Sequence, residues 1–127
     1  MKKSLTIHRK EDKEMKIILI EDVTPLHEVL GVIVKKRGGD NQVVVADDLK
    51  KAKEIIDSNL DADILILDGN IIGGNTIPLL KDVRGKFRGK IIAFSGDPEM
   101  QAELLNNGAD IEINKGQLTQ IFEIISA

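Results

Sequence analysis

The stretch IILIED, residues 17–22, places two acids directly after four branched apolar residues. Three similar apolar runs follow it, at residues 43–46 (VVVA), 64–67 (ILIL) and 91–94 (IIAF). Each run is too short for a buried helix and is bounded by turn-forming or acidic residues, which is typical of buried strands. Their apolarity is continuous rather than alternating, so both faces of each strand should be covered, as in a parallel sheet.

Between these runs, apolar residues recur at spacings of three and four, which indicates amphipathic helices. The marker residues of the five expected helices are Leu26, Val29, Leu30 and Ile33; Leu49, Ala52, Ile56 and Leu60; Ile77, Leu80, Val83 and Phe87; the segment 98–106; and Leu118, Ile121, Phe122 and Ile125. Thr24 should cap the first helix, and Asp47 or Asp48 should start the second. The alternating segment 111–113 predicts a fifth strand at an edge of the sheet.

Five strand–helix units in succession predict an α/β fold with a doubly wound parallel sheet. We expect the flavodoxin-like strand order 2-1-3-4-5. Half of a Rossmann domain is the alternative, but its glycine fingerprint should follow the first strand, where residues 21–24 read EDVT. The globular domain should span residues 15–127. Residues 1–14, with five basic and three acidic side chains, are expected to form a flexible extension, although residues 5–7 could add a short strand.

The composition excludes several classes of protein. The absence of cysteine excludes disulfide frameworks, zinc-thiolate sites and cysteine nucleophiles. A net charge of −3, without Trp or Tyr, argues against nucleic-acid binding. No apolar run approaches the roughly 18 residues of a membrane span, so membrane insertion is not expected. No export signal precedes the first strand, and we therefore expect a cytoplasmic protein.

Polar side chains follow four of the expected strands, at the edge where ligands bind in such sheets. They are Glu21 and Asp22, then Asp68, Ser95 and Lys115. Three carboxylates so close together repel one another and call for a hard cation such as Mg²⁺, after which one carboxylate can attack a phosphoryl group. Each residue alone could instead be a helix cap, a turn residue or a solvated lysine. Their conjunction at one edge favours the phosphoryl-transfer site.

Five motifs together resemble the response-regulator receiver domain of two-component signalling, in its single-domain, chemotaxis-regulator-like form. They are IILIED (17–22), DILILD (63–68), IIAFSGD (91–97), NNGAD (106–110) and INK (113–115). The resemblance covers residues 15–127. Although each motif is weak alone, the set is highly specific.

The resemblance implies a role for each residue of the site. It implies that Asp68 is the phosphoacceptor, that Lys115 pairs with the acyl phosphate, and that Ser95 is the hydroxyl that contacts the phosphoryl group. Glu21 and Asp22 resemble the acidic metal-binding pair, and the backbone carbonyl of Asn70 stands where the family ligates Mg²⁺. The implied donor is a histidine kinase or a phosphotransfer protein. The implied output surface, for a downstream protein, comprises the fourth helix, fifth strand and fifth helix, residues 97–126.

Three positions depart from the family pattern. Gly116 replaces the proline after the lysine, and Ile72 replaces the proline four residues after the phosphoacceptor, so we expect a more flexible loop there. Glu112 replaces the aromatic switch residue. A buried carboxylate without a partner is costly, so Glu112 should face solvent. His27 is expected to be structural or solvated, and residues 35–37 (KKR) to form a solvated helix end.

These departures leave two functions open. The first is a phosphorylatable switch that takes its phosphoryl group from a phosphohistidine. Such a phosphoacceptor assists its own phosphorylation and dephosphorylation, and is not a conventional enzyme. The second is a phosphorylation-independent pseudo-receiver that acts as a protein-interaction module. A flavin-binding protein is disfavoured, because no aromatic side chains stand where they could flank the ring. The chain stops as the fifth helix ends, so it either acts by docking or is part of a longer protein.

Overall fold

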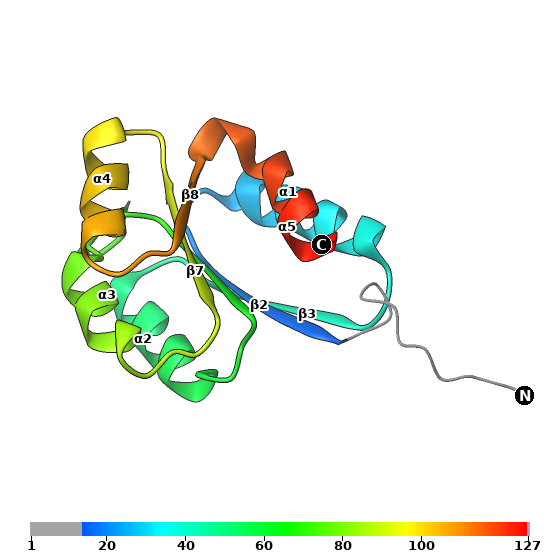
Figure 1. Cartoon of the computed structure of the whole chain (residues 1–127), viewed down its shortest axis with the longest axis horizontal. Helices are drawn as coiled ribbons and strands as arrows, with labels where there is room; N and C mark the ends of the chain where they lie inside the picture. The colour runs from blue at the N-terminus through cyan, green and yellow to red at the C-terminus, as the bar shows by residue number, and fades with distance from the viewer. Residues whose placement is uncertain (1–13, 127) are drawn as a thin grey trace, which may run out of the picture.

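Five parallel strands form the central sheet of the computed structural model, which describes residues 14–126 (Figure 1). They are β2 (Met15–Ile20), β3 (Asn41–Ala46), β4 (Ile64–Leu67), β7 (Lys90–Ser95) and β8 (Ile111–Asn114). Their order across the sheet is β3-β2-β4-β7-β8, which confirms the predicted order 2-1-3-4-5 and the flavodoxin-like fold. The expected extension and the alternative strand at residues 5–7 lie outside the described residues, apart from Glu14.

Helices cover both faces of this sheet, as the continuous apolar strands predicted (Figure 1). They are α1 (Thr24–Arg37), α2 (Leu49–Ser58), α3 (Ile77–Arg84), α4 (Pro98–Asn106) and α5 (Ile121–Ser126). Alternate residues of one strand enter two different cores: Ile18 packs with α2, α3 and α4, whereas Ile17 packs with α1 and α5. The register aligns Ile17 with Val43 and Ile64, so that apolar rows cross the sheet. Burial on both faces is the main stabilising contribution.

Several predicted helix ends need correction. Thr24 does not cap α1, because the helix begins at Thr24 itself and its N-cap, Val23, makes no side-chain cap. Leu60 and Phe87 lie beyond the ends of α2 and α3, yet both pack against the core, which explains their helical spacing in the sequence. The fifth helix begins as a 3-10 helix, η2 (Lys115–Gln120), before α5. In contrast, Asp48 caps α2 as expected and accepts the N–H of Lys51 at 2.8 Å.

The predicted solvated helix end at residues 35–37 is wrong for its last residue. Lys35 and Lys36 are exposed, whereas Arg37 is buried. Its Nε donates to the carbonyl of Ile125 at 2.8 Å, and its Nη1 donates to Asn41 Oδ1 at 2.8 Å. A buried guanidinium is tolerated because these acceptors replace water. Arg37 thereby joins the end of α1 to α5.

The segment after Asp68 contains a small hairpin that the sequence did not reveal. Strand β5 (Asn70–Ile71) pairs antiparallel with β6 (Gly74–Asn75). Gly73 and Gly74 turn the chain with φ of 102° and 134°, which other residues rarely adopt. The carbonyl of Ile72 accepts the N–H of Leu49 at 2.8 Å, so the hairpin is fastened to the start of α2. Among the described residues, no helix has the length and apolarity needed to cross a membrane.

Candidate functional site

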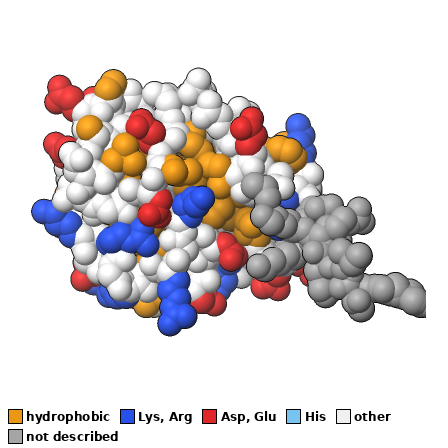
Figure 2. All heavy atoms as spheres, in the orientation of Figure 1, with side chains coloured by type: hydrophobic (Ala, Val, Ile, Leu, Met, Phe, Trp, Pro, Cys, Tyr) orange, Lys and Arg blue, Asp and Glu red, His pale blue; other side chains and the backbone are white. Residues whose placement is uncertain are grey.

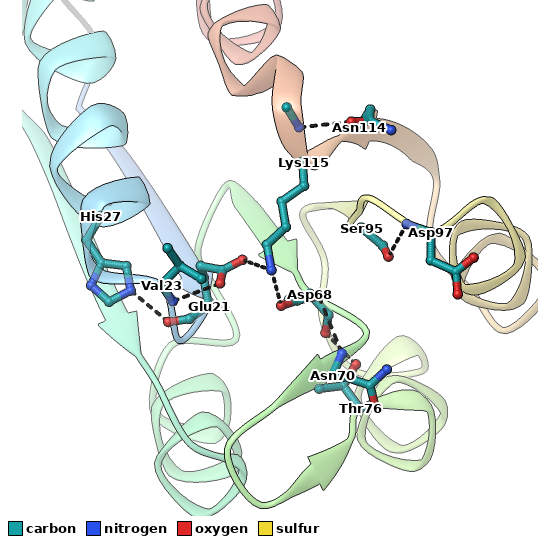
Figure 3. Close-up of polar contacts among 11 residues, drawn as sticks. Glu21, Val23, His27, Asp68, Asn70, Thr76, Ser95, Asp97, Asn114 and Lys115 are labelled. Carbon is teal, nitrogen blue, oxygen red and sulfur yellow. Dashed lines mark hydrogen bonds and ion pairs between the residues drawn. The ribbon is translucent and has the colours of Figure 1, made fainter.

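The side chains predicted to form a site converge at the carboxyl edge of the sheet (Figure 3). Glu21 follows β2, Asp68 follows β4, and Lys115 follows β8 and begins η2. Glu21 is fully buried, and Asp68 is 4% exposed. One carboxylate oxygen from each of Glu21, Asp22 and Asp68 lies within 4.8 Å of the others. The structure therefore assembles the three carboxylates that the strand ends predicted.

Lys115 bridges two of these acids. Its Nζ lies 2.8 Å from Asp68 Oδ2 and 3.0 Å from Glu21 Oε1. Burial acts to lower the pKa of Lys115, but hydrogen bonding and charge from Asp68 and Glu21 outweigh this effect and raise its pKa. The lysine is therefore a firmly protonated cation, which neutralises one of the three negative charges.

Glu21 is held by the main chain that follows it. The N–H of Val23 donates to Glu21 Oε2 at 2.9 Å. Burial raises the pKa of Glu21 above its ordinary value, and the charge of Asp68 adds to this, although hydrogen bonds from Val23 and Lys115 oppose it. Without a further cation, the protein therefore disfavours the ionised form of this carboxyl group.

A buried threonine fixes the turn that carries Asp68. Thr76 Oγ1 donates to the carbonyl of Asp68 at 2.6 Å, and the Thr76 N–H donates to the carbonyl of Gly69 at 2.9 Å. A side chain at Gly69 would collide with Met100 of α4. Sequence reasoning missed Thr76, because the hairpin that returns it to Asp68 left no signal beyond the glycine pair at 73–74.

Ser95 and Asn70 lie near this cluster without completing it. Ser95 is buried at the end of β7, and its Oγ accepts the N–H of Asp97 at 3.0 Å (Figure 3). Among the described residues, Ser95 makes no hydrogen bond to Asp68. The cap of α4 is Asp97, not Ser95. The N–H of Asn70 lies 3.4 Å from Asp68 Oδ1, and the role of its carbonyl stays a prediction.

The positions that depart from the family pattern lie around the cluster. Glu112 on β8 is exposed, as expected for a carboxylate that makes no ion pair among the described residues. The N–H of Gly116 donates to Asn114 Oδ1 at 2.9 Å, which closes the turn into η2. The segment 70–75 forms the hairpin described above, and its expected flexibility stays a prediction.

The donor set fits a hard divalent cation. Glu21 Oε1 is buried, and its partner among the described residues is the ammonium group of Lys115 at 3.0 Å. Within residues 14–126, the carboxylate of Asp22 accepts no hydrogen bond. Carboxylate oxygens clustered at a partly open edge are the ligands that Mg²⁺ prefers. Glu21, Asp22 and Asp68 are therefore the residues that would hold the ion.

Known structures share this fold. No family model matches the chain, and no curated protein matches it in sequence. A candidate response regulator from Chloroflexus aurantiacus J-10-fl has a TM-score of 0.75 at 23% identity, covering 88% of this chain and 93% of its own. A two-component response regulator from Clostridium difficile has a TM-score of 0.75 at 20% identity, and the match covers 87% of this chain and 90% of that protein. The BeF3-activated N-terminal receiver domain of Klebsiella pneumoniae RstA has a TM-score of 0.71 at 24% identity, and the match covers 88% of this chain and 99% of that domain. The chain has the receiver-domain fold.

Proposed function

We propose that this chain is a phosphorylatable signalling switch of a two-component phosphorelay, with Asp68 as the phosphoacceptor. The observation that carries the proposal is the contact between Lys115 Nζ and Asp68 Oδ2, at 2.8 Å, within the acidic cluster. If Asp68 served only to form a turn, it would need no acidic neighbours. The repulsion among the three carboxylates destabilises the fold unless a cation binds. The receiver-domain fold supports the same function.

Asp68 would act as a nucleophile toward a phosphohistidine. One carboxylate oxygen forms a bond to phosphorus while the P–N bond of the donor breaks, and the electron pair leaves with the imidazole nitrogen. Lys115 stays beside the new acyl phosphate and offsets its charge. Mg²⁺ held by Glu21, Asp22, Asp68 and the Asn70 carbonyl would neutralise the phosphoryl oxygens.

Ser95 would carry the change to α4. Its hydroxyl now accepts the N–H of Asp97, directly before the first turn of that helix. A hydroxyl drawn toward a phosphoryl group on Asp68 would weaken this hydrogen bond. The start of α4 is therefore the first element outside the site that would respond.

The partners follow from this chemistry. The donor is a histidine kinase or a phosphotransfer protein, and the output is a protein that docks on residues 97–126 of α4, β8 and α5. Phe122 on α5 is 38% exposed there, and Figure 2 shows hydrophobic side chains gathered near the centre of its view, with charged groups around them.

The domain would comprise residues 15–127, with residues 1–14 as an extension. It would work in the cytoplasm, without binding nucleic acid or inserting into a membrane.

Mass spectrometry of the intact protein tests the proposal. Incubation with Mg²⁺ and acetyl phosphate should add one phosphate to the native chain and none to Asp68→Asn, because an amide is a poor nucleophile. A receiver of known activity serves as the positive control. Full labelling of Asp68→Asn would overturn the assignment of the nucleophile.

A phosphorylation-independent pseudo-receiver is the second candidate. It is favoured by the exposed Glu112, which stands where the family has an aromatic switch residue, and by Gly116, which stands where the family has a proline. The same experiment separates the two functions. No added phosphate, under conditions that label the control receiver, supports the pseudo-receiver.

A further inference from the structure

The ring of His27, in the first turn of α1, contacts the main chain of the site. Its Nε2 lies 2.7 Å from the carbonyl oxygen of Glu21 (Figure 3). A carbonyl oxygen only accepts hydrogen bonds, so Nε2 carries a proton and donates it. Within residues 14–126, no backbone N–H donates to this carbonyl, which lies just beyond β2. The histidine therefore satisfies an acceptor that the sheet leaves open.

This hydrogen bond affects the position of Asp22, because Glu21 and Asp22 share a peptide plane. The carbonyl of Glu21 and the nitrogen of Asp22 belong to one rigid, planar group. Holding the carbonyl therefore sets the orientation of the plane and the direction in which the side chain of Asp22 leaves the backbone. The carboxylate of Asp22 accepts no hydrogen bond among the described residues, so its approach to the cluster depends on where the main chain places its Cβ.

The turn between β2 and α1 is held on its other side by the acidic cluster itself. The N–H of Val23 donates to Glu21 Oε2, and α1 has no side-chain cap at Val23. This bond involves a carboxylate that a metal ion would also engage. Within residues 14–126, His27 is thus the side chain outside the acidic cluster that holds the turn, and its hydrogen bond does not compete with the metal for a carboxylate oxygen.

We propose that His27 is a positioning residue for the metal site, which orients the Glu21–Asp22 peptide so that Asp22 can ligate the ion. The proposal rests on the function proposed above, because it assumes that Mg²⁺ binds this cluster. His27 itself contacts neither the ion nor the phosphoryl group. Loss of a group that orients a metal ligand typically weakens metal binding about tenfold or more, and we expect a loss of about tenfold here.

Two variants of equal side-chain length isolate the donor. His27→Gln retains an N–H group that can reach the carbonyl, whereas His27→Met does not; His27→Ala serves as a second variant without a donor, should His27→Met fail to fold. Asn59→Ala is the matched control, because Asn59 Nδ2 also donates to a main-chain carbonyl, that of Ile55, at 2.8 Å. The control bond lies at the end of α2, outside the acidic cluster. The Mg²⁺ dissociation constant is measured by calorimetry with magnesium chloride alone, at one fixed pH for all variants.

The expected result is a dissociation constant about tenfold higher in the variants without a donor, and within about threefold of native in His27→Gln and Asn59→Ala. The backbone amide resonance of Asp22 should also move in the metal-free donorless variants but not in Asn59→Ala. Native affinity in the donorless variants would overturn the positioning role alone. An equal loss in His27→Gln and His27→Met would also overturn it, because the donor would not be the cause. Absence of Mg²⁺ binding by the native chain would overturn both this inference and the proposed function.

Discussion

Asp22→Ala should raise the melting temperature of the metal-free protein and abolish its stabilisation by Mg²⁺. Of the three clustered carboxylates, Glu21 and Asp68 each contact Lys115, and Asp22 does not. Asp22 therefore experiences repulsion from two carboxylates without contacting Lys115. Since its carboxylate accepts no hydrogen bond among the described residues, alanine removes the charge without breaking such a bond.

The size of the effect follows from the geometry. Two carboxylate oxygens 4.8 Å apart repel by about 3.5 kcal/mol at an effective dielectric constant of about 20, and by about 0.9 kcal/mol in bulk water. Attraction to Lys115 offsets roughly one of the two repulsions, and Asp22 is half-buried, so partial solvent screening applies. We therefore expect a gain of about 1–2 kcal/mol, which corresponds to a rise of roughly 4–8 °C for a domain of this size.

Circular dichroism is the suitable probe, because the chain contains neither Trp nor Tyr for intrinsic fluorescence. Melting curves are recorded with a chelator and then with excess Mg²⁺. Asp40→Ala is the matched control, since it removes an exposed carboxylate that makes no ion pair among the described residues. An unchanged or lower melting temperature of Asp22→Ala in chelator would refute the repulsion argument. A full Mg²⁺ shift in that variant would show that the ion binds elsewhere.

Three further outcomes are expected. Lys115→Met should reduce labelling by acetyl phosphate by about 10²-fold, because a preorganised cation beside the developing charge is lost; labelling at the native rate, followed by intact mass, would contradict this. Folding raises the pKa of Glu21, so its contribution to stability is present below the unfolded pKa near 4.5 and is lost as pH rises through the higher folded pKa. Metal-free urea unfolding across that range should therefore show the native chain losing stability relative to Glu21→Gln, and parallel curves would refute the argument. Beryllofluoride, a phosphoryl mimic, should shift backbone amides in segments 95–100 and 70–75 while Glu112 stays solvent-facing. Large shifts throughout residues 110–126 with small ones at 95–100 would point to another route.

Local pattern was enough to predict the elements and the edge at which the site forms. Branched apolar runs must be strands buried on both faces, and parallel strands send all their carboxyl ends to one edge. The positions of Glu21, Asp68 and Lys115 at that edge therefore followed from the order of residues alone. The contacts of Lys115 with Glu21 and Asp68 confirm that these side chains meet at one edge. Glu112 is exposed, as predicted.

The tertiary structure decided which partner each polar group has. The sequence places Arg37 in what looks like a solvated helix end. In the structure it donates to the carbonyl of Ile125, 88 residues away, because the packing of α5 brings that acceptor within range. Thr76 donates to the carbonyl of Asp68 because the glycine hairpin returns the chain, and His27 reaches the carbonyl of Glu21 because the first turn of α1 lies beside the end of β2. Burial follows a periodicity of two to four residues, which a sequence displays directly. Hydrogen bonds between distant segments depend on helix placement to within an ångström or less, and the packing of the whole core determines that placement.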